Sequence, residues 1–490
     1  MIVHHYIACD LGAESGRVVL GALSDGRLML EEIHRFSNGP VHVNDTLRWD
    51  VLHIFGELKT GLAKIAARGI KPESLSCDSW GVDYAWLRDG EPLLTAPFHY
   101  RDPSRNEGAF ERTFALVPRA EVFAETGIQF MTINTIHQLH ADLHMRPWVL
   151  KSANQFLNIG DYFNFLFSGV ARAEESLAST TQLYNPRKHA WSRALRTKLG
   201  LPKKIFPDVV RSGTVLGPLL RSVIAETGLP NMQIVATCSH DTGAAVAAVP
   251  AEGTGWAYLS SGTWSLLGIE SEKPIITDQS REYNFTNEVG LGGGIRFLKN
   301  IIGLWILQEC RRHWAKEGRD YDYAELTKQA EAATSIGALI NPNDQRFATP
   351  GNMPQKIVDY CRETGQKPPT TSGEFVRCTL ESLALLYRQT LDQVEEVTGE
   401  KLTTLHIVGG GSQNKLLNQL SANATGRTVI AGPVEATAAG NVLIQALALG
   451  HVASLDEMRR ITRESFAVAT YMPQPSPSRD AALQHFKSLK

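Results

Sequence analysis

The sequence predicts an α/β protein of two large domains, and three observations support that prediction. The chain has 490 residues, which is more than one hydrophobic core usually supports. A strand–turn–strand pattern opens the chain at residues 7–20, and a similar pattern lies at residues 256–267. Strands and helical segments follow each hairpin, so we expect one domain over residues 1–247 and a second over residues 248–490.

Composition and charge narrow the class of protein. Hydrophobic residues make up 43% of the chain and charged residues 20%, as in ordinary soluble globular proteins. The formal net charge of −2 argues against a nucleic-acid partner. The chain does not open with a basic segment and an apolar core, and it has no apolar run long enough to span a bilayer. We therefore expect no signal peptide and no membrane partner.

The six cysteines indicate a reducing compartment. They are scattered along the chain and form no CxxC pair. This spacing suits reduced thiols in a cytosol better than a disulfide framework, so we expect a cytoplasmic protein. Cys361 and Cys378 are close enough in sequence to leave one bridge possible.

The first hairpin excludes one common nucleotide-binding motif. Strands are predicted at residues 7–10, 16–23 and 27–36, with Asp25-Gly26 as a hairpin turn. In a dinucleotide-binding fold the glycine loop opens a helix, but here Gly12 and Gly16 lead into another strand. The loop at residues 10–17 is therefore either a phosphate-holding hairpin or only a tight turn.

A helix and a bent strand pair follow the hairpin. Residues 49–68 have helical periodicity, which predicts one apolar face that contains Leu52, Phe55, Leu58 and Leu62. Residues 75–87 are predicted as two strands bent at Gly81. Asp78 and Asp83 flank that bend, where they either reach a ligand or bond the local backbone at a β-bulge. Residues 100–105 are expected to form a polar surface turn with a salt bridge.

The middle of the chain is predicted to be mixed. Helices are expected at residues 135–145 and 160–167, loops at 212–214 and 216–218, a buried strand at 232–237 and a helix of small residues at 243–249. Small residues allow two elements to pack closely, so this last helix is expected at the domain joint. Pro250, Gly253 and Gly255 support a boundary there.

The residues after the strand predicted at 232–237 are the candidate catalytic residues. His240, Asp241 and Thr242 follow the strand end, which makes Asp241 a potential base. The second hairpin turns on Ser-Ser-Gly-Thr at residues 260–263, and backbone N–H groups in such a turn can hold a phosphate.

The second half repeats the pattern of strands and helices. Helices are predicted at residues 301–312, 376–398, 415–423 and 440–449, and strands at residues 405–408 and 427–431. Gly409, Gly410 and Gly411 end the first of these strands. They either allow a flat ligand such as adenine to approach closely or form a strand-to-helix turn that needs a positive φ.

These motifs, taken in order, resemble the FGGY family of carbohydrate kinases. The resemblance rests on residues 10–17, 240–242, 261–264 and 409–414, and it covers nearly the whole chain. Residues 78–83, 298–305 and 431–437 resemble the branch of the family that phosphorylates L-rhamnulose.

The resemblance implies two actin-like, ribonuclease-H-like ATPase domains around a central cleft. It also implies transfer of the ATP γ-phosphate to the C1 hydroxyl of L-rhamnulose with Mg²⁺, with Asp241 as the general base. The residues expected to contact the sugar are Gly81, Asp83, His240, Asp241, Thr242 and Asn300. Those expected to bind ATP are Ala13, Glu14, Ser15, Gly16, Arg17, Thr263, Gln308 and Gly410.

The residue chemistry agrees with phosphoryl transfer. An aspartate is ionised at neutral pH and can accept the proton of a hydroxyl group. Asp10 lies at a strand end beside the first phosphate loop, so we expect it to act on Mg²⁺ through a water molecule.

Other functions remain open at this point. Another ketose, such as L-fuculose or D-xylulose, would need the same catalytic groups. An actin-like ATPase without sugar kinase activity would share the glycine hairpins but would not need Asp241. A non-catalytic sugar-binding module would not need three nucleotide loops. The sequence does not distinguish a monomer from a weak dimer.

Overall fold

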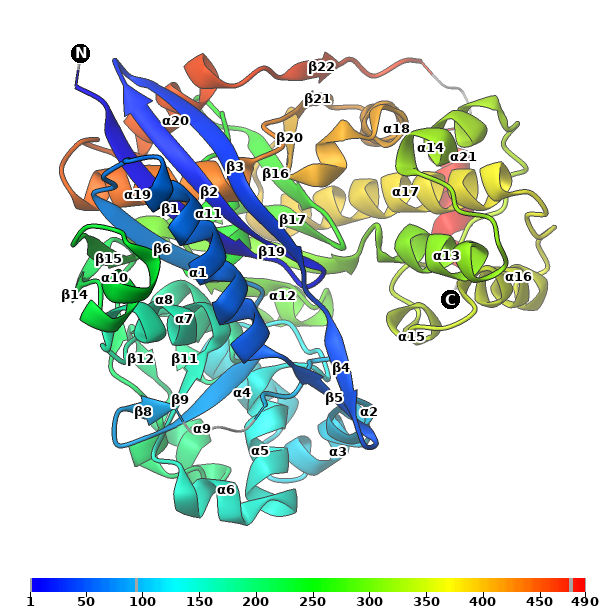
Figure 1. Cartoon of the computed structure of the whole chain (residues 1–490). Helices are drawn as coiled ribbons and strands as arrows, with labels where there is room; N and C mark the ends of the chain where they lie inside the picture. Colours follow the sequence, from blue (N-terminus) through cyan, green and yellow to red (C-terminus); the bar gives the residue numbers. More distant parts are fainter. Residues whose placement is uncertain (1, 93–95, 476–478, 490) are drawn as a thin grey trace. The chain divides into compact units, whose positions relative to one another are not determined.

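The computed structural model describes residues 2–92, 96–475 and 479–489, and its chain forms two compact units (Figure 1). Unit 1 contains Met1–Pro250, Glu270–Phe297 and Ala436–Ser465. Unit 2 contains Ala251–Ile269, Leu298–Glu435 and Phe466–Lys490. The chain therefore passes between the units several times, and each unit is assembled from segments that are distant in sequence.

A six-stranded mixed sheet forms the centre of unit 1. Its order is β14 (Thr214–Pro218), β15 (Gln233–Ala236), β6 (Ser74–Ser79), β1 (His4–Leu11), β2 (Ser15–Ser24) and β3 (Arg27–Ser37). Strands β1, β2 and β3 are antiparallel neighbours, whereas β6 and β15 run parallel to β1. The carboxyl ends of three parallel strands thus meet at one edge of the sheet.

The predicted first hairpin and third strand are confirmed. Asp25 and Gly26 both have positive φ, at 49° and 71°, which is the conformation that a two-residue hairpin turn favours. A loop was predicted at residues 216–218, and this prediction is wrong. The segment forms β14, which pairs with β15 through a bulge between Val215 and Gly217. The glycine and proline therefore mark an irregular edge strand.

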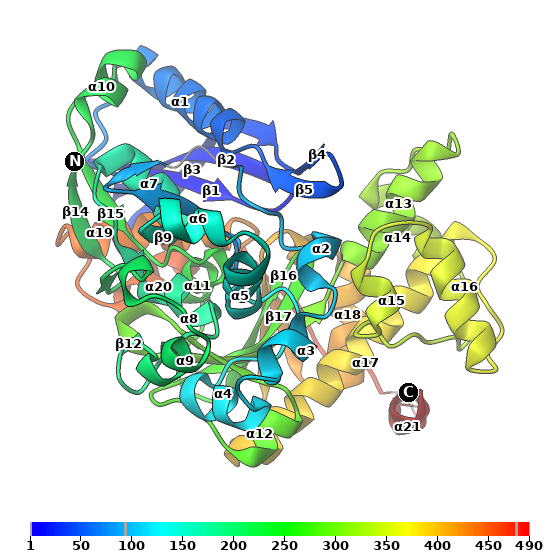
Figure 2. The same cartoon turned by 90° about the horizontal axis from the view of Figure 1, so that it is seen from below.

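Helix α1 (Val51–Ala67) lies along β2 and β3 in both views (Figures 1 and 2). Its buried face contains Ile54, Leu58 and Leu62, but Leu52 is 66% exposed, so the predicted apolar face was misaligned by part of a turn. A Cβ on Gly61 of this helix would lie 2.5 Å from Val18 of β2, which shows how closely the helix packs on the sheet.

The opposite face of the sheet packs against α19 (Ala436–Ala448). Val442 of this helix occupies the space that a Cβ on Gly21 of β2 would need. Residues 18 and 21 point to opposite sides of a strand, so α1 and α19 cover different faces. Helix α19 also crosses α11 (Asp241–Ala247), where a Cβ on Gly440 would lie 1.8 Å from the Ala244 carbonyl oxygen. The small residues predicted at 243–249 therefore permit a close helix crossing.

The remaining parts of unit 1 form a second, mostly helical layer around an aromatic core. Strand β7 (Tyr84–Arg88) pairs with β8 (Glu91–Pro92) and β9 (Gln155–Asn158), so the two strands predicted around Gly81 belong to different sheets. The helices of this layer are α2 (Pro103–Asn106), α3 (Ala109–Phe114), α4 (Arg119–Thr126), α5 (Thr135–Met145), α6 (Pro147–Ser152), α7 (Ile159–Ser168), α8 (Glu175–Thr180) and α9 (Arg193–Lys198). Helices α5 and α7 confirm the predicted segments.

Short elements complete unit 1. The strands are β4 (Pro40–Val43), β5 (Thr46–Trp49), β10 (Ala173–Glu174), β11 (Tyr184–Asn185), β12 (Ala190–Trp191), β13 (Val209–Val210) and β18 (Thr286–Val289). The helices are η1 (Lys203–Ile205), α10 (Arg221–Thr227), α12 (Asp278–Glu282), η2 (Leu291–Gly293) and α20 (Leu455–Ser465).

Unit 2 repeats the strand succession of unit 1. Strands β16 (Trp256–Ser261) and β17 (Trp264–Ser271) form the antiparallel hairpin, and β20 (Thr404–Val408) and β21 (Thr428–Ala431) follow in parallel as β6 and β15 do. The edge strand β22 (Ala469–Tyr471) is antiparallel. This repeat confirms the two-hairpin pattern that the sequence predicted.

Helices surround this second sheet. Figures 1 and 2 show α13 and α14 near the long helix α17. The helices are α13 (Trp305–Lys316), α14 (Tyr323–Ala332), α15 (Gln345–Ala348), α16 (Met353–Glu363), α17 (Ser372–Thr398), η3 (Gly410–Gln413), α18 (Lys415–Thr425) and α21 (Arg479–Ser488). The helix predicted from residue 301 begins later, because β19 (Ile295–Ile302) continues through that point. The six cysteines are buried and free.

Candidate active site

Four acidic or basic side chains meet at the carboxyl edge of the sheet in unit 1. Asp10 of β1 is the register partner of Asp78 of β6. The next strand position, Ser79, forms a parallel bridge with His240. Because β15 runs parallel to β6, the segment after it brings His240 and Asp241 to the same edge. The predicted metal, base and sugar-contact residues of unit 1 therefore converge.

The carboxylates of Asp10, Asp78 and Asp241 influence one another through their charges. Burial raises the pKa of Asp78 well above its ordinary value, and the charges of Asp10 and Asp241 raise it further. Burial also raises the pKa of Asp241, where His240 opposes the shift and Asp10 adds to it. The neighbouring carboxyl groups therefore oppose the ionisation of Asp78 and Asp241.

The two carboxylate oxygens of Asp78 differ in their hydrogen bonding. Asn441 of α19 donates to Asp78 Oδ2 at 2.6 Å. Oδ1 is buried and has no hydrogen-bond partner among the described residues. Since a buried acceptor is rarely left unsatisfied, this oxygen suggests a ligand or water position. Arg17 of β2 pairs with Asp10, which offsets part of the negative charge.

Asp241 is held through one of its two oxygens. The Thr242 amide donates to Oδ1 at 2.5 Å, and the Thr242 hydroxyl donates to the same oxygen at 3.2 Å. His240 Nε2 also lies 3.4 Å from Oδ1. Oδ2 has no recorded polar contact within the described part of the chain, and the side chain is 30% exposed. This leaves Oδ2 as the oxygen that can take a proton from a substrate.

A buried ion pair holds the other nitrogen of His240. Glu288 Oε2 lies 3.3 Å from His240 Nδ1, and Arg296 Nη2 lies 3.1 Å from the same atom. Glu288 and Arg296 are themselves 3.2 Å apart, and their side chains are 4% and 1% exposed. Both residues belong to unit 1, and they fix the orientation of the imidazole from its far side.

Gly81 is beside His240 and beside an unusual backbone position. A Cβ on Gly81 would lie 3.4 Å from Thr180 Oγ1 and 3.5 Å from His240 Nε2, so the glycine keeps this approach open. The next residue, Val82, has φ +69°, which a β-branched side chain rarely adopts. Thr135 Oγ1 donates to the Val82 carbonyl at 2.6 Å and holds it in place. Such constrained positions are concentrated at ligand sites.

Asp83 is fully buried and receives four hydrogen bonds from the protein. Its donors are Trp49 Nε1 (2.6 Å), Trp80 Nε1 (3.1 Å), Tyr100 N (3.1 Å) and Gln138 Nε2 (3.0 Å). Burial raises the pKa of Asp83 to about 7, although these donors oppose the shift. The contacts favour a role in positioning the bend, and direct contact with a sugar stays a prediction.

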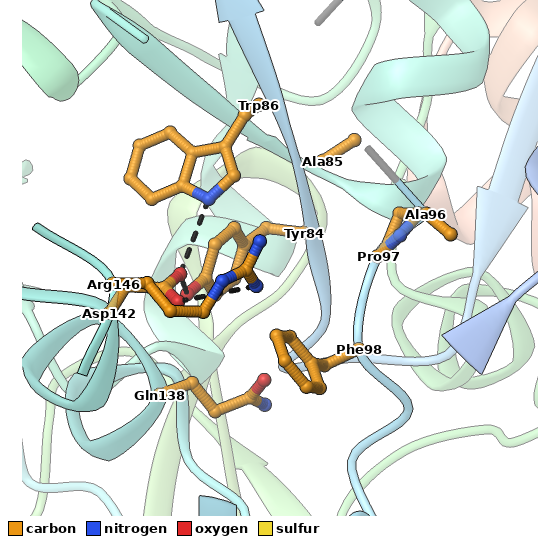
Figure 3. A pocket seen from close by; sticks show the side chains of 9 residues that line it. All are labelled: Tyr84, Ala85, Trp86, Ala96, Pro97, Phe98, Gln138, Asp142 and Arg146. Carbon is orange, nitrogen blue, oxygen red and sulfur yellow. Dashed lines mark hydrogen bonds and ion pairs between the residues drawn. The ribbon is translucent and has the colours of Figure 1, made fainter. Parts of the chain in front are cut away.

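Gln138, which donates to Asp83, also lines a small pocket (Figure 3). At its floor, Asp142 accepts hydrogen bonds from Tyr84 Oη at 2.6 Å and from Trp86 Nε1 at 3.2 Å, and it pairs with Arg105. Figure 3 shows the Arg146 side chain beside the Asp142 carboxylate, 3.7 Å away. The turn at residues 100–105, predicted as a surface feature, therefore contributes a buried ion pair that supports the sheet beneath Asp83.

The first loop is organised largely by its own backbone. Gly12 N donates to the Ser15 carbonyl at 2.9 Å, and Asn38 contacts both Gly12 O and Glu14 O. A Cβ on Gly16 would lie 2.2 Å from the Phe36 ring, so this glycine is needed for packing between β2 and β3. ATP contacts by Ala13, Glu14, Ser15, Gly16 and Arg17 stay a prediction.

In unit 2 the structure brings Thr263 and Gln308 together. Gln308 Nε2 donates to Thr263 Oγ1 at 3.2 Å, and the Trp305 amide donates to the Thr263 carbonyl at 3.2 Å. Gln308 Oε1 is buried and lacks a hydrogen-bond partner within the residues described. The turn of the second hairpin and the start of α13 therefore form one polar site with an acceptor available.

The three glycines after β20 have different surroundings. Gly409 has φ +83°, and a Cβ on Gly411 would lie 2.0 Å from Ser261 Oγ. Nothing lies within 4 Å of the position of a Cβ on Gly410. Gly409 and Gly411 are thus required by backbone and packing, and Gly410 alone presents open space to a ligand.

Asn300 lies on β19 next to Lys299, and successive strand residues point to opposite faces. Lys299 Nζ donates to Gln393 Oε1 of α17 at 3.0 Å, and burial lowers its pKa to about 8. Asn300 therefore points away from α17.

Two functional candidates were not identified from the sequence, and a third was considered only as a residue at the Gly81 bend. Asp78 was noted only at the bend, although its position one strand over from Asp10 could have suggested a shared site. Glu288 and Arg296 lie far along the chain from His240, and no spacing signal connects them to it.

Comparisons with known proteins define the class. Residues 5–248 match the N-terminal domain, and residues 257–449 the C-terminal domain, of the FGGY family of carbohydrate kinases. The chain belongs to this family, as the sequence resemblance predicted. Its fold is the two-domain α/β fold of sugar kinases. It resembles the xylulose kinase of Lactobacillus acidophilus (TM-score 0.78, 15% identity, 99% and 96% of the two chains). It also resembles the ADP-bound glycerol kinase of Plasmodium falciparum (TM-score 0.77, 16% identity, 99% and 97%).

Within the family, the chain is similar to proteins named rhamnulokinase. It is 43% identical to that of Bacteroides thetaiotaomicron over 484 residues, which cover 99% of each chain. It is 42% identical to that of Enterococcus faecalis (96% of this chain, 95% of the relative) and 37% identical to that of Bacillus subtilis (98% of each). In the part of the chain that the structure describes, no helix has the length and apolar character needed to cross a membrane.

Proposed function

We propose that the protein transfers the γ-phosphate of ATP to the C1 hydroxyl of L-rhamnulose and forms L-rhamnulose 1-phosphate and ADP. Similarity to rhamnulokinases over almost the whole chain supports this substrate. The observation that carries the chemistry is the Asp241 carboxylate, held through Oδ1 with Oδ2 left for a substrate. The proposed compartment is the cytoplasm.

Asp241 takes the hydroxyl proton as the oxygen attacks phosphorus. Phosphoryl transfer needs alignment, charge neutralisation and a proton acceptor, and general-base catalysis typically contributes about 10²–10⁴-fold in rate. Because Thr242 and His240 orient Oδ1, Oδ2 meets the hydroxyl in a fixed direction. His240 and Gly81 are the proposed sugar contacts of unit 1 that hold C1 in place.

The acidic edge fits a divalent cation such as Mg²⁺. The carboxylates of Asp10 and Asp78 supply the oxygen ligands that Mg²⁺ prefers, and the unpartnered Asp78 Oδ1 supports this fit. When bound, the ion neutralises phosphate charge. Arg17, paired with Asp10, holds that carboxylate in orientation from β2.

Unit 2 is proposed to hold the nucleotide. The Thr263 turn offers backbone N–H groups and a hydroxyl to phosphates, and Gln308 offers the adjacent acceptor Oε1. Gly410 gives a flat base an open approach. Ala13, Ser15 and Arg17 are the proposed phosphate contacts in unit 1.

A ketose panel tests this function. The purified protein is given ATP, Mg²⁺ and L-rhamnulose, L-fuculose or D-xylulose, and ADP release is followed by a coupled assay. We expect the largest kcat/KM with L-rhamnulose, because an inverted hydroxyl leaves a buried polar group without its partner. A higher kcat/KM for L-fuculose or D-xylulose would show that L-rhamnulose is not the preferred substrate. ATP consumption that is independent of any ketose would contradict the kinase function.

A further inference from the structure

We infer that unit 1 has a second metal site, formed by His4, Glu73 and His451, which takes a transition-metal ion such as Zn²⁺ and is separate from the phosphoryl-transfer site. One ligand atom from each side chain lies within 4.8 Å of the other two, and this is the one group of that kind among the described residues. Two imidazoles and one carboxylate are a ligand set that proteins use for Zn²⁺.

The distances between ligand atoms are near those that an ion requires. His4 Nδ1 lies 2.5 Å from Glu73 Oε1, and His451 Nε2 lies 3.4 Å from Glu73 Oε2. Bonds of about 2.0–2.1 Å at tetrahedral angles place ligand atoms about 3.3 Å apart. These two distances end on different oxygens of Glu73. One ligand atom of each side chain lies within 4.8 Å of the other two, so the ligand atoms have to move by up to about 1.5 Å for one ion to bind all three.

The rings can make the remaining adjustment. The imidazoles of His4 and His451 are stacked, with centroids 3.8 Å apart and planes at 22°, so a shared ion requires one ring to tilt. The two side chains are 28% and 22% exposed, which leaves room for that movement and for a water molecule as the fourth ligand.

Supporting contacts hold the three ligands in place. Tyr6 Oη lies 2.6 Å from His451 Nδ1 and can accept the proton of that nitrogen, which leaves the Nε2 lone pair for the ion. The Glu73 amide donates to the His5 carbonyl and the His451 amide to the Ala446 carbonyl, each at 2.8 Å.

The site lies at the amino end of β1, whereas Asp10 lies at its carboxyl end. His4 and Asp10 are six residue steps apart along β1, which is about 20 Å. An ion there would join the starts of β1 and β6 to the end of α19. That helix begins where the chain returns from unit 2, and it donates Asn441 to Asp78. We therefore expect the ion to stabilise unit 1 without entering the reaction.

Calorimetric titration tests the inference with untagged, EDTA-treated protein and ZnCl₂ at about pH 7.5, because metal ions bind deprotonated ligands. We expect one equivalent of Zn²⁺ to bind the wild type and to raise its melting temperature. Glu73→Gln and His451→Ala should lose both effects. His34→Ala is the matched control, because His34 Nε2 also pairs with a glutamate, Glu57, at 2.6 Å, but it has no second histidine.

Kinase activity with Mg²⁺ provides the folding control, since both site variants should keep wild-type kcat. Absence of the one-equivalent binding in the wild type would overturn the inference. Binding that persists in both Glu73→Gln and His451→Ala would also overturn it, because the ion would then use other ligands.

Discussion

The buried Glu288–Arg296 pair gives the sharpest test of how the proposed base is positioned. Glu288→Gln keeps the size of the side chain but removes its charge, 3.2 Å from Arg296 Nη2. At an effective dielectric constant of about 20, two unit charges at that distance attract by about 5 kcal/mol. Removing one partner of a buried pair typically costs about 3–5 kcal/mol. We therefore expect Glu288→Gln to lower the free energy of unfolding by about 3–5 kcal/mol.

The same variant should weaken catalysis in a specific way. Glu288 then no longer orients Arg296, whose Nη2 bonds His240 Nδ1, so Nε2 no longer holds Asp241 Oδ1 and the sugar in place. A misplacement of about 1 Å can cost about 10²-fold in rate, and we expect a loss of that order in kcat/KM for the ketose. KM for ATP should change little.

A double variant separates positioning from stability. Glu288→Gln with Arg296→Gln removes both charges, so part of the lost stability should return while the loss in kcat/KM remains. Glu31→Gln is the control, since Glu31 pairs with Arg68 at an exposed position, where an ion pair adds little to stability. Urea unfolding of the single and double variants gives the coupling free energy between Glu288 and Arg296. The reasoning is refuted if this coupling free energy is below about 0.5 kcal/mol, or if kcat/KM for the ketose is unchanged in Glu288→Gln.

Three further predictions follow from the site. Gly410→Val should raise KM for ATP and leave the melting temperature unchanged. Gly411→Val should lower the melting temperature, because its Cβ meets Ser261. Equal effects of the two variants would contradict the assignment of Gly410 to the nucleotide site. Because the pKa of Asp241 is raised and the base must be ionised, kcat/KM should begin to fall with decreasing pH above the ordinary aspartate pKa of about 3.9; an acid limb at that ordinary value would disagree. Gly440→Ala should lower the melting temperature strongly, because the methyl group meets the Ala244 carbonyl in the α11–α19 crossing; a variant as stable as the wild type would exclude that crossing.

Much of the fold follows from local sequence patterns. The predicted helix at residues 135–145 has the same bounds as α5, and both hairpins form where alternating residues flank a turn. Local patterns are weaker where tertiary pairing decides. Gly217 and Pro218 indicate a loop, but pairing with β15 makes the segment an edge strand. The two strands around Gly81 are neighbours in sequence and yet join different sheets.

The candidate site could be predicted in part, because some of its carboxylates lie at the ends of predicted strands. Asp10 lies near the end of β1 and Asp241 follows β15, and the parallel order of β1, β6 and β15 then places them at one edge. Glu288 and Arg296 come from β18 and β19, and only the fold brings their buried charges to His240.

The rate of phosphoryl transfer by Asp241→Asn tests the central claim most directly. The asparagine keeps the size and the hydrogen bonds of Oδ1 but cannot accept the proton. Our account predicts that kcat with L-rhamnulose falls by about 10²–10⁴-fold while the dissociation constant for the ketose stays near that of the wild type. A kcat near the wild-type value would show that Asp241 is not the base.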